Sequence, residues 1–347
     1  GCSRGVQYAV TAFFALNPIW GVFIQTQVKD TLYTGLFVLF VLKTADLLLF
    51  PQEWQGSRKR LAAYAALGIL CCLLRKNGIY AVVPMVLASA FVLTGKQLRK
   101  PLLVVMLAVV IGSFGFDVFT EKVLDIPAGS VGEALSVPMQ QTARYIRDYG
   151  NEVTDDERTA IEKVLDYDAI AQSYMPELSD GVKQYYKNPG KGDLARYMLV
   201  WAKMLLKHPV CYFEATHANS HGYYTITKCR AINDYYTFNN DICMEMSEMN
   251  VHYLDKSGYL RYAFVQALSA FEKLPLVGLT TSIGFMAWLT AVLGLWLARC
   301  KAKPVLPVFI GLGIFWLTCI ASPVNDCMRY FLPVAGCLPL VFCLAAV

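Results

Sequence analysis

Apolar residues gather into eight long runs along this chain, and polar segments separate them. The runs cover residues 8–25, 31–50, 61–74, 78–94, 101–118, 278–298, 304–321 and 328–346. A helix rises about 1.5 Å per residue, so roughly 20 apolar residues cross the hydrocarbon layer of a bilayer. The pattern therefore predicts a mainly α-helical fold, a polytopic transmembrane helix bundle of about eight spans.

The third and fourth runs are short for membrane spans, and a polar tetrapeptide lies between them. Merging them would give a helix of 34 residues with Arg75 and Lys76 in mid-bilayer. We therefore expect two short helices joined by residues 75–78, with this turn below the outer membrane surface. Non-helical backbone at such depth is tolerated where it lines protein or a water-filled cavity.

The basic residues of the short loops predict the orientation. Short cytoplasmic loops retain Lys and Arg, whereas exported segments need not. Alternating spans bring the loop bases to one face, which we assign to the cytoplasm: Arg58, Lys59, Arg60, Lys96, Arg99, Lys100, Arg299, Lys301 and Lys303. The 120–277 segment, with 16 Lys+Arg against 21 Asp+Glu, then lies outside the cell.

This orientation predicts three parts of the chain. Residues 1–119 form five spans, residues 120–277 an extracytoplasmic, mostly helical domain, and residues 278–347 three spans. The expected location is the cytoplasmic (plasma) membrane of a bacterium. The net charge of +5 is the sum of a basic cytoplasmic face and an acidic outer domain, so it does not indicate nucleic-acid binding. Because the chain starts without Met and stops in an apolar run, we expect a fragment of a longer protein.

The outer segment carries local signals for helices. Residues 133–149 and 193–207 have apolar residues at helical spacing, and Thr154 with Glu157 makes a capping box. His208-Pro209 ends the second of these helices, and residues 188–190 (NPG) predict a turn. Cys229 and Cys243 are the one close pair of outer cysteines, which either form a disulfide or stay reduced.

Several ionisable residues fall near the outer membrane face. They are Lys29, Arg75, Lys76 and Arg329 among the bases, and Asp30 and Asp326 among the acids. Such groups at membrane depth are costly and often mark a site. As a cluster they would hold an anionic, membrane-resident substrate and supply a carboxylate for acid–base work or metal binding. Singly, Lys29 would snorkel, Arg329 would anchor a helix end, and residues 75–76 would form a solvated turn.

The chain resembles bacterial GT-C class membrane glycosyltransferases, which take sugar from a polyprenyl-phosphate donor on the outer membrane face. The matching pieces are residues 17–18 (NP), 29–32 (KDTL), 75–78 (RKNG), 322–326 (SPVND) and 329–333 (RYFLP). Residues 135–144 (LSVPMQQTAR) look like a marker of an uncharacterised bacterial membrane-protein family associated with this class. The matches extend over nearly the whole chain.

The resemblance implies roles for individual residues. Asp30 would be the catalytic or metal-binding acid, Arg329 would hold the lipid phosphate with Arg75 and Lys76, and Mg²⁺ or Mn²⁺ would assist. Lys29 and Asp326 would belong to the same substrate site. One departure is serious, because the class carries its principal catalytic acid in an outer loop upstream of the first span seen here. That loop would lie in sequence preceding Gly1.

Other candidate residues have two readings each. Gln140, Gln141 and Arg144 would contact a sugar, or they are structural polar residues of an outer helix. His217 and His221, four residues apart, would share a metal ion, although an ordinary helix face is favoured because no third ligand fits a known pattern. The sequence has no Gly-rich phosphate loop and no nucleotide-binding motif, so no nucleotide cofactor is expected.

Two functions of different classes follow. The first is a glycosyltransferase that moves sugar from a polyprenyl-phosphate-linked donor to a cell-envelope glycan, lipid or protein. The second is a transporter or flippase of an anionic lipid or solute. Transporters place charges near the bilayer midplane and show repeated halves. Here the charges gather at one end and a large domain divides the spans five and three, which favours the enzyme. A non-catalytic assembly factor is a third possibility.

Overall fold

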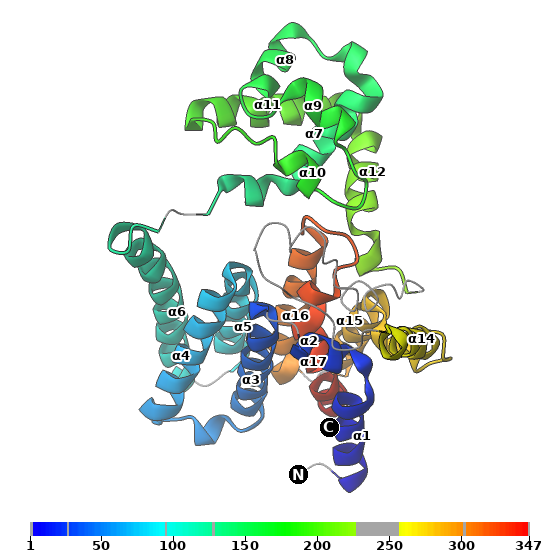
Figure 1. Cartoon of the computed structure of the whole chain (residues 1–347). Helices are drawn as coiled ribbons and strands as arrows, with labels where there is room; N and C mark the ends of the chain where they lie inside the picture. The colour runs from blue at the N-terminus through cyan, green and yellow to red at the C-terminus, as the bar shows by residue number, and fades with distance from the viewer. Residues whose placement is uncertain are drawn as a thin grey trace. The chain divides into compact units, whose positions relative to one another are not determined.

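The computed structural model describes residues 3–25, 28–93, 96–126, 129–226, 257–300 and 303–345. Helices dominate these ranges, and the described residues contain isolated β-bridges but no β-strand. The chain divides into two compact units (Figure 1). The first comprises Gly1–Gly115, Tyr224–Trp316 and Cys327–Val347, and the second comprises Phe116–Tyr223 and Leu317–Asp326. The predicted mainly α-helical fold is confirmed.

The first unit is built from long apolar helices. They are α1 (Arg4–Leu16), α2 (Pro18–Gln25), α3 (Lys29–Leu49), α4 (Arg58–Leu74), α5 (Ile79–Val92), α6 (Lys96–Lys122), α14 (Tyr259–Glu272), α15 (Ile283–Arg299), α16 (Leu306–Ile320) and α17 (Met328–Ala345). The last residues of α6, from Phe116, and of α16, from Leu317, fall in the second unit. Helix α3 packs against α4, α5 and α17, and α17 also packs against α15. Figure 1 shows α3, α4 and α5 side by side.

Several of these helices suit a membrane. Within the described residues, α3, α17 and the Gln97–Lys122 part of α6 are long and apolar enough to cross a bilayer. The pair α1 and α2, bent by 53°, would add a fourth crossing as one broken span. Shorter apolar helices are Lys76–Val92, α15 and α16. The first predicted apolar run thus forms two helices, α1 and α2, and each of the others contains one α-helix, whereas eight separate spans remain a prediction.

The predicted break between the third and fourth runs is confirmed. Helix α4 ends at Leu74, and Arg75 takes an extended backbone with φ −145° and ψ 112°. A 3₁₀ turn, η2 (Lys76–Gly78), then leads directly into α5. Gly78 is needed for its size, because a Cβ there would lie 3.0 Å from the Cys71 carbonyl oxygen and 3.1 Å from the Tyr33 hydroxyl.

The second unit is a bundle of shorter helices. They are α7 (Ser136–Tyr149), α8 (Asp155–Glu162), α9 (Tyr167–Gln172), α10 (Asp180–Lys183), α11 (Lys191–Lys207) and α12 (Pro209–Ser220), with 3₁₀ turns η3 (Val131–Leu135), η4 (Gly150–Glu152) and η5 (His221–Tyr223). The capping box is present, since Thr154 accepts from the Glu157 amide and the Glu157 carboxylate accepts from the Thr154 amide. The predicted end of α11 before Pro209 is also confirmed.

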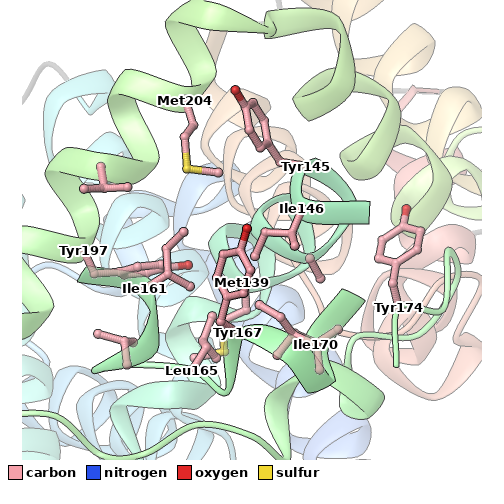
Figure 2. Close-up of a cluster of buried hydrophobic side chains, with 14 of the residues drawn as sticks. Met139, Tyr145, Ile146, Ile161, Leu165, Tyr167, Ile170, Tyr174, Tyr197 and Met204 are labelled. Carbon is pink, nitrogen blue, oxygen red and sulfur yellow. The ribbon is translucent and has the colours of Figure 1, made fainter. Parts of the chain in front are cut away.

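An apolar core holds the second unit together. Figure 2 shows Met139 and Ile146 of α7, Ile161 of α8, Ile170 of α9 and Tyr197 of α11 around a common centre. All five side chains are buried. The Tyr197 hydroxyl is within 2.9 Å of the Thr142 hydroxyl, which satisfies its one polar group. This core is separate from the packing of the apolar helices.

The boundaries of the second unit differ from the 120–277 domain expected from charge. Its start at Phe116 lies near residue 120, but the chain from Tyr224 onward groups with the apolar helices. The segment Leu317–Asp326, which precedes α17, belongs to the second unit instead. There the Asn219 side chain donates to the Ser322 carbonyl at 2.9 Å, and Tyr223 donates to the Val324 carbonyl at 2.8 Å. Cys229 and Cys243 lie outside the described residues.

Candidate anion-binding site

The carboxylate of Asp30 lies between two arginines within the first unit. Asp30 is in the first turn of α3 and is buried, with 6% of its surface exposed. Arg75 Nη1 donates to Asp30 Oδ1 at 3.0 Å, and Arg329 Nε lies 3.7 Å from Asp30 Oδ2. The three residues come from α3, the end of α4 and the first turn of α17. The predicted convergence of Asp30, Arg75 and Arg329 is therefore present in the structure.

Aromatic rings surround the Arg75 guanidinium. Its Cζ lies 4.8 Å from the ring centre of Tyr330, 5.7 Å from that of Phe315 and 5.9 Å from that of Tyr33. Tyr33 and Phe315 are fully buried and stacked on each other. The negative face of an aromatic ring attracts a guanidinium, most strongly where water is excluded. Arg75 is thus fixed by one carboxylate and three rings.

Arg329 is the more accessible of the two cations. Its side chain is 33% exposed, against 12% for Arg75. Arg329 Nη2 donates to the Tyr330 hydroxyl at 3.2 Å, and its Cζ lies 5.1 Å from the Tyr330 ring centre. Tyr330 therefore contacts both guanidinium groups. The greater exposure of Arg329 makes it the easier of the two guanidinium groups for a ligand to reach.

The charges of this cluster favour an anionic ligand. Two guanidinium groups and one carboxylate leave a net charge of +1. Asp30 and Arg329 also lie in the first turns of α3 and α17, and helix N-termini carry partial positive charge. Guanidinium forks match phosphate oxygens, with two parallel hydrogen bonds available to each. A phosphate is the ligand that best fits these donors.

The same residues do not suit a divalent cation. Mg²⁺ is usually held by one or two carboxylates together with waters and substrate phosphates. Here one carboxylate is available and two arginines flank it. Their charge repels a dication. Among the described residues, no cluster of three or more His, Cys, Asp or Glu side chains is placed to hold a metal ion.

The structure places the remaining bases and Asp326 differently. Lys29 and Lys76 are exposed and adjoin Asp30 and Arg75 in the sequence. Asp326 belongs to the second unit, where it packs over Gly222 with a left-handed φ of 54°. Its contact with Gly222 indicates that Asp326 has a structural role in the loop before α17.

The predicted sugar contacts all lie in the second unit. Gln140 is buried and donates to the Met175 carbonyl. Gln141 is buried too, donating to the Thr216 hydroxyl at 2.8 Å and accepting from Trp201 Nε1 at 3.0 Å. Arg144 forms ion pairs with Asp148 and Glu214. These partners favour the structural reading, so the proposed site does not include the three residues.

The contacts of His217 and His221 also favour structural residues over ligands of a shared metal ion. Helix α12 ends at Ser220, so His221 begins the 3₁₀ turn η5. The two imidazole rings are 5.7 Å apart, and His221 Nε2 faces Glu177 Oε1 at 3.6 Å. His221 Nδ1 also lies 3.1 Å from Asn325 Nδ2. These contacts connect η5 to the loop before α17.

Sequence reasoning missed the aromatic residues of the site. Tyr33 follows Asp30 by one helical turn and Tyr330 adjoins Arg329, so their positions in the sequence already indicated that both lie near the site. Phe315 is an apolar residue within an apolar run and carried no such signal. Only the packing of α16 brings its ring near Arg75.

The fold and the cluster define a class of α-helical protein with helices suited to a membrane and a carboxylate shared by two arginines. The chain belongs to the family described as "Family of unknown function (DUF6020)", whose family model matches residues 2–346. No curated protein and no solved structure matched the chain.

Proposed function

We propose that this protein is a membrane glycosyltransferase that moves a sugar from a polyprenyl-phosphate donor to a cell-envelope acceptor. The reaction would occur at the outer face of a bacterial plasma membrane. The observation that carries the proposal is the Asp30 carboxylate between Arg75 and Arg329. It supports a site for a singly charged phosphodiester beside a carboxylate. The apolar helices around it suit the long hydrocarbon chain of the donor.

The proposed chemistry balances without a cofactor. The acceptor hydroxyl oxygen forms a bond to the anomeric carbon of the sugar as the anomeric carbon–oxygen bond to phosphate breaks. The electron pair of that bond leaves with the polyprenyl phosphate, and the hydroxyl proton passes to a carboxylate, for which Asp30 is the candidate. Attack on the side opposite to the leaving group inverts the configuration at the anomeric carbon. Arg329 and Arg75 stabilise the charge that grows on the phosphate.

The arginines would contribute most where water is partly excluded. Hydrogen bonds between charged partners are worth about 1.5–3 kcal/mol, or roughly 10- to 150-fold in affinity or rate. Arg75 is held by its rings, so Arg329, the more exposed cation, is assigned the principal phosphate contact. Lys29 and Lys76 would add long-range attraction for an anion.

The test uses the full chain reconstituted in liposomes. Radiolabelled polyprenyl-phosphate glucose, mannose, galactose and arabinose are supplied in turn, with an envelope extract as acceptor. Arg329→Ala should reduce transfer about 10- to 150-fold. Arg329→Lys should recover part of it, because a point charge replaces a planar fork. Arg299→Ala, at the last residue of α15, is the matched control and should transfer normally.

Two results would reject the proposal. Normal transfer by a folded Arg329→Ala protein would remove Arg329 from the site. Movement of intact lipid-linked sugar across the bilayer, without transfer to an acceptor, would identify the protein as a flippase of an anionic lipid instead.

A further inference from the structure

We infer that Asp30 is an exchangeable counter-ion, which occupies the phosphate position of Arg329 until a lipid phosphate displaces it. This inference rests on the proposed function and concerns regulation of the same site. On binding, the phosphate takes Arg329, and the released Asp30 oxygen becomes accessible to the acceptor hydroxyl. The carboxylate thus competes with the donor for binding but is needed for the transfer step.

The two ion pairs of Asp30 are unequal. Oδ1 accepts a hydrogen bond of 3.0 Å from Arg75, whereas Oδ2 is 3.7 Å from Arg329 Nε. The second separation exceeds the usual range of an N–H···O bond. The contact with Arg329 therefore has the smaller hydrogen-bond contribution and is the one that an incoming anion can replace. Asp30 would keep its bond to Arg75 throughout.

The surroundings of the two arginines favour the same order of events. Arg75 is enclosed by Tyr33, Phe315 and Tyr330, and its side chain is 12% exposed. Arg329 is 33% exposed. A ligand that arrives from outside the cluster meets Arg329 first. Arg75 then holds the displaced carboxylate nearby, so the charge does not have to leave the site.

This exchange would connect donor binding to catalysis. With no phosphate bound, both oxygens of Asp30 face guanidinium groups, so an acceptor hydroxyl has to compete with them for the carboxylate. With a phosphate on Arg329, one oxygen is available. The carboxylate can then activate an acceptor hydroxyl only when the donor is in place, and it does not activate water in the empty site. Neutralising Asp30 should consequently affect binding and transfer in opposite directions.

The experiment measures binding and transfer separately. Undecaprenyl phosphate is titrated onto the full chain in nanodiscs of zwitterionic lipid, and transfer is measured as above. Asp30→Asn should bind undecaprenyl phosphate at least about fivefold more tightly than the unmodified protein. That is the effect of removing a like charge at roughly 4 Å even in water. Its transfer should fall to background.

Asp46→Asn is the matched control. Asp46 lies on the same helix and accepts a hydrogen bond from Trp54. It is sixteen residues beyond Asp30, or about 24 Å along the helix. Its neutralisation should change neither binding nor transfer. Asp30→Ser is a second neutral variant, with the same expected direction, in case the Asn variant does not fold.

The outcomes separate this inference from the proposed function. Weaker or unchanged binding by folded Asp30→Asn, with normal binding by the unmodified protein, would make Asp30 a fixed positioning residue and overturn the exchange. Failure of both neutral variants to fold would overturn it too, because the carboxylate would then be structural. Absence of binding by the unmodified protein would reject the proposed function itself.

Discussion

Asp326 packs so closely against Gly222 that there is no room for a Cβ on the glycine. A Cβ built at Gly222 would lie 2.4 Å from the Asp326 Cβ and 2.8 Å from its Cα. The Gly222 amide also donates to Asn325 Oδ1 at 2.8 Å. This contact fixes the segment Leu317–Asp326, the end of α16 with the loop that follows it, onto the turn η5 within the second unit. The loop leads directly into α17, which carries Arg329.

Gly222→Ala should therefore destabilise the second unit. The clash involves the Cα and Cβ of Asp326, which no side-chain rotation can move, so we expect a loss of about 1–3 kcal/mol in the free energy of unfolding. Amide hydrogen exchange of α12 and the 317–326 loop in the full chain measures it. Gly192→Ala is the control, because a Cβ at this α11 position has nothing within 4 Å. Equal exchange in the two variants would contradict the predicted clash.

Asp30 and Arg75 should stabilise the first unit as a pair. Their hydrogen bond of 3.0 Å is largely shielded from water, so removal of one partner leaves the other charge poorly solvated. A double-mutant cycle with Asp30→Asn and Arg75→Gln should give a coupling energy of about 1.5–3 kcal/mol. Thermal unfolding in detergent provides the four stabilities. Additive effects of the two substitutions would mean that the ion pair contributes nothing to folding.

The second unit should lose stability in acid through Glu157. Burial by itself would raise the pKa of Glu157, but hydrogen bonds from Lys207 and Thr154 outweigh it and hold the pKa below its ordinary value of 4.5. The stabilisation is present above the unfolded pKa near 4.5 and is lost as pH falls through the lower folded pKa. Glu157→Gln should cost about 1.5 kcal/mol at neutral pH and flatten this acid response.

Hydrogen exchange of α8 and α11, corrected for intrinsic rates, follows this response from neutral pH to about pH 3. The control is Asp168→Asn, which removes an exposed ion pair with Arg158. An exposed pair contributes about 0–1 kcal/mol, so this variant should keep the acid response. An unchanged acid response in Glu157→Gln would assign the effect to other carboxylates.

The second unit should face the outside of the cell. The prediction rests on the basic loops at 58–60, 96–100 and 299–303. A Cys introduced at the exposed Lys191 should react with a membrane-impermeant thiol reagent in intact cells, above the background of the unmodified chain. A Cys at the exposed Lys59 should react only after the cells are opened. The reverse pattern would invert the topology and remove the proposed outer-face reaction.

The sequence by itself determined the local structure of this protein. Apolar runs predicted the helices of the first unit other than α14, Arg75 to Gly78 predicted the break between α4 and α5, and Thr154 with Glu157 predicted a helix start. These features depend on residues within a few positions of one another. Helical periodicity, capping and backbone breaks act over that range, so they can be read without knowing the fold.

The loop charges predicted that Asp30, Arg75 and Arg329 lie at one membrane face, but only the tertiary structure decided which of these charges pair and which rings surround them. Arg75 and Arg329 are 45 and 299 residues from Asp30 along the chain, and nothing local requires either to reach it. Their convergence depends on the packing of α3 against α4 and α17, and the ring of Phe315 arrives with α16. The same holds for the loop Leu317–Asp326, which joins the second unit through hydrogen bonds to distant residues. Long-range contacts depend on how whole helix faces fit together, and that fit is a property of side-chain shapes summed over the interface rather than of any short pattern.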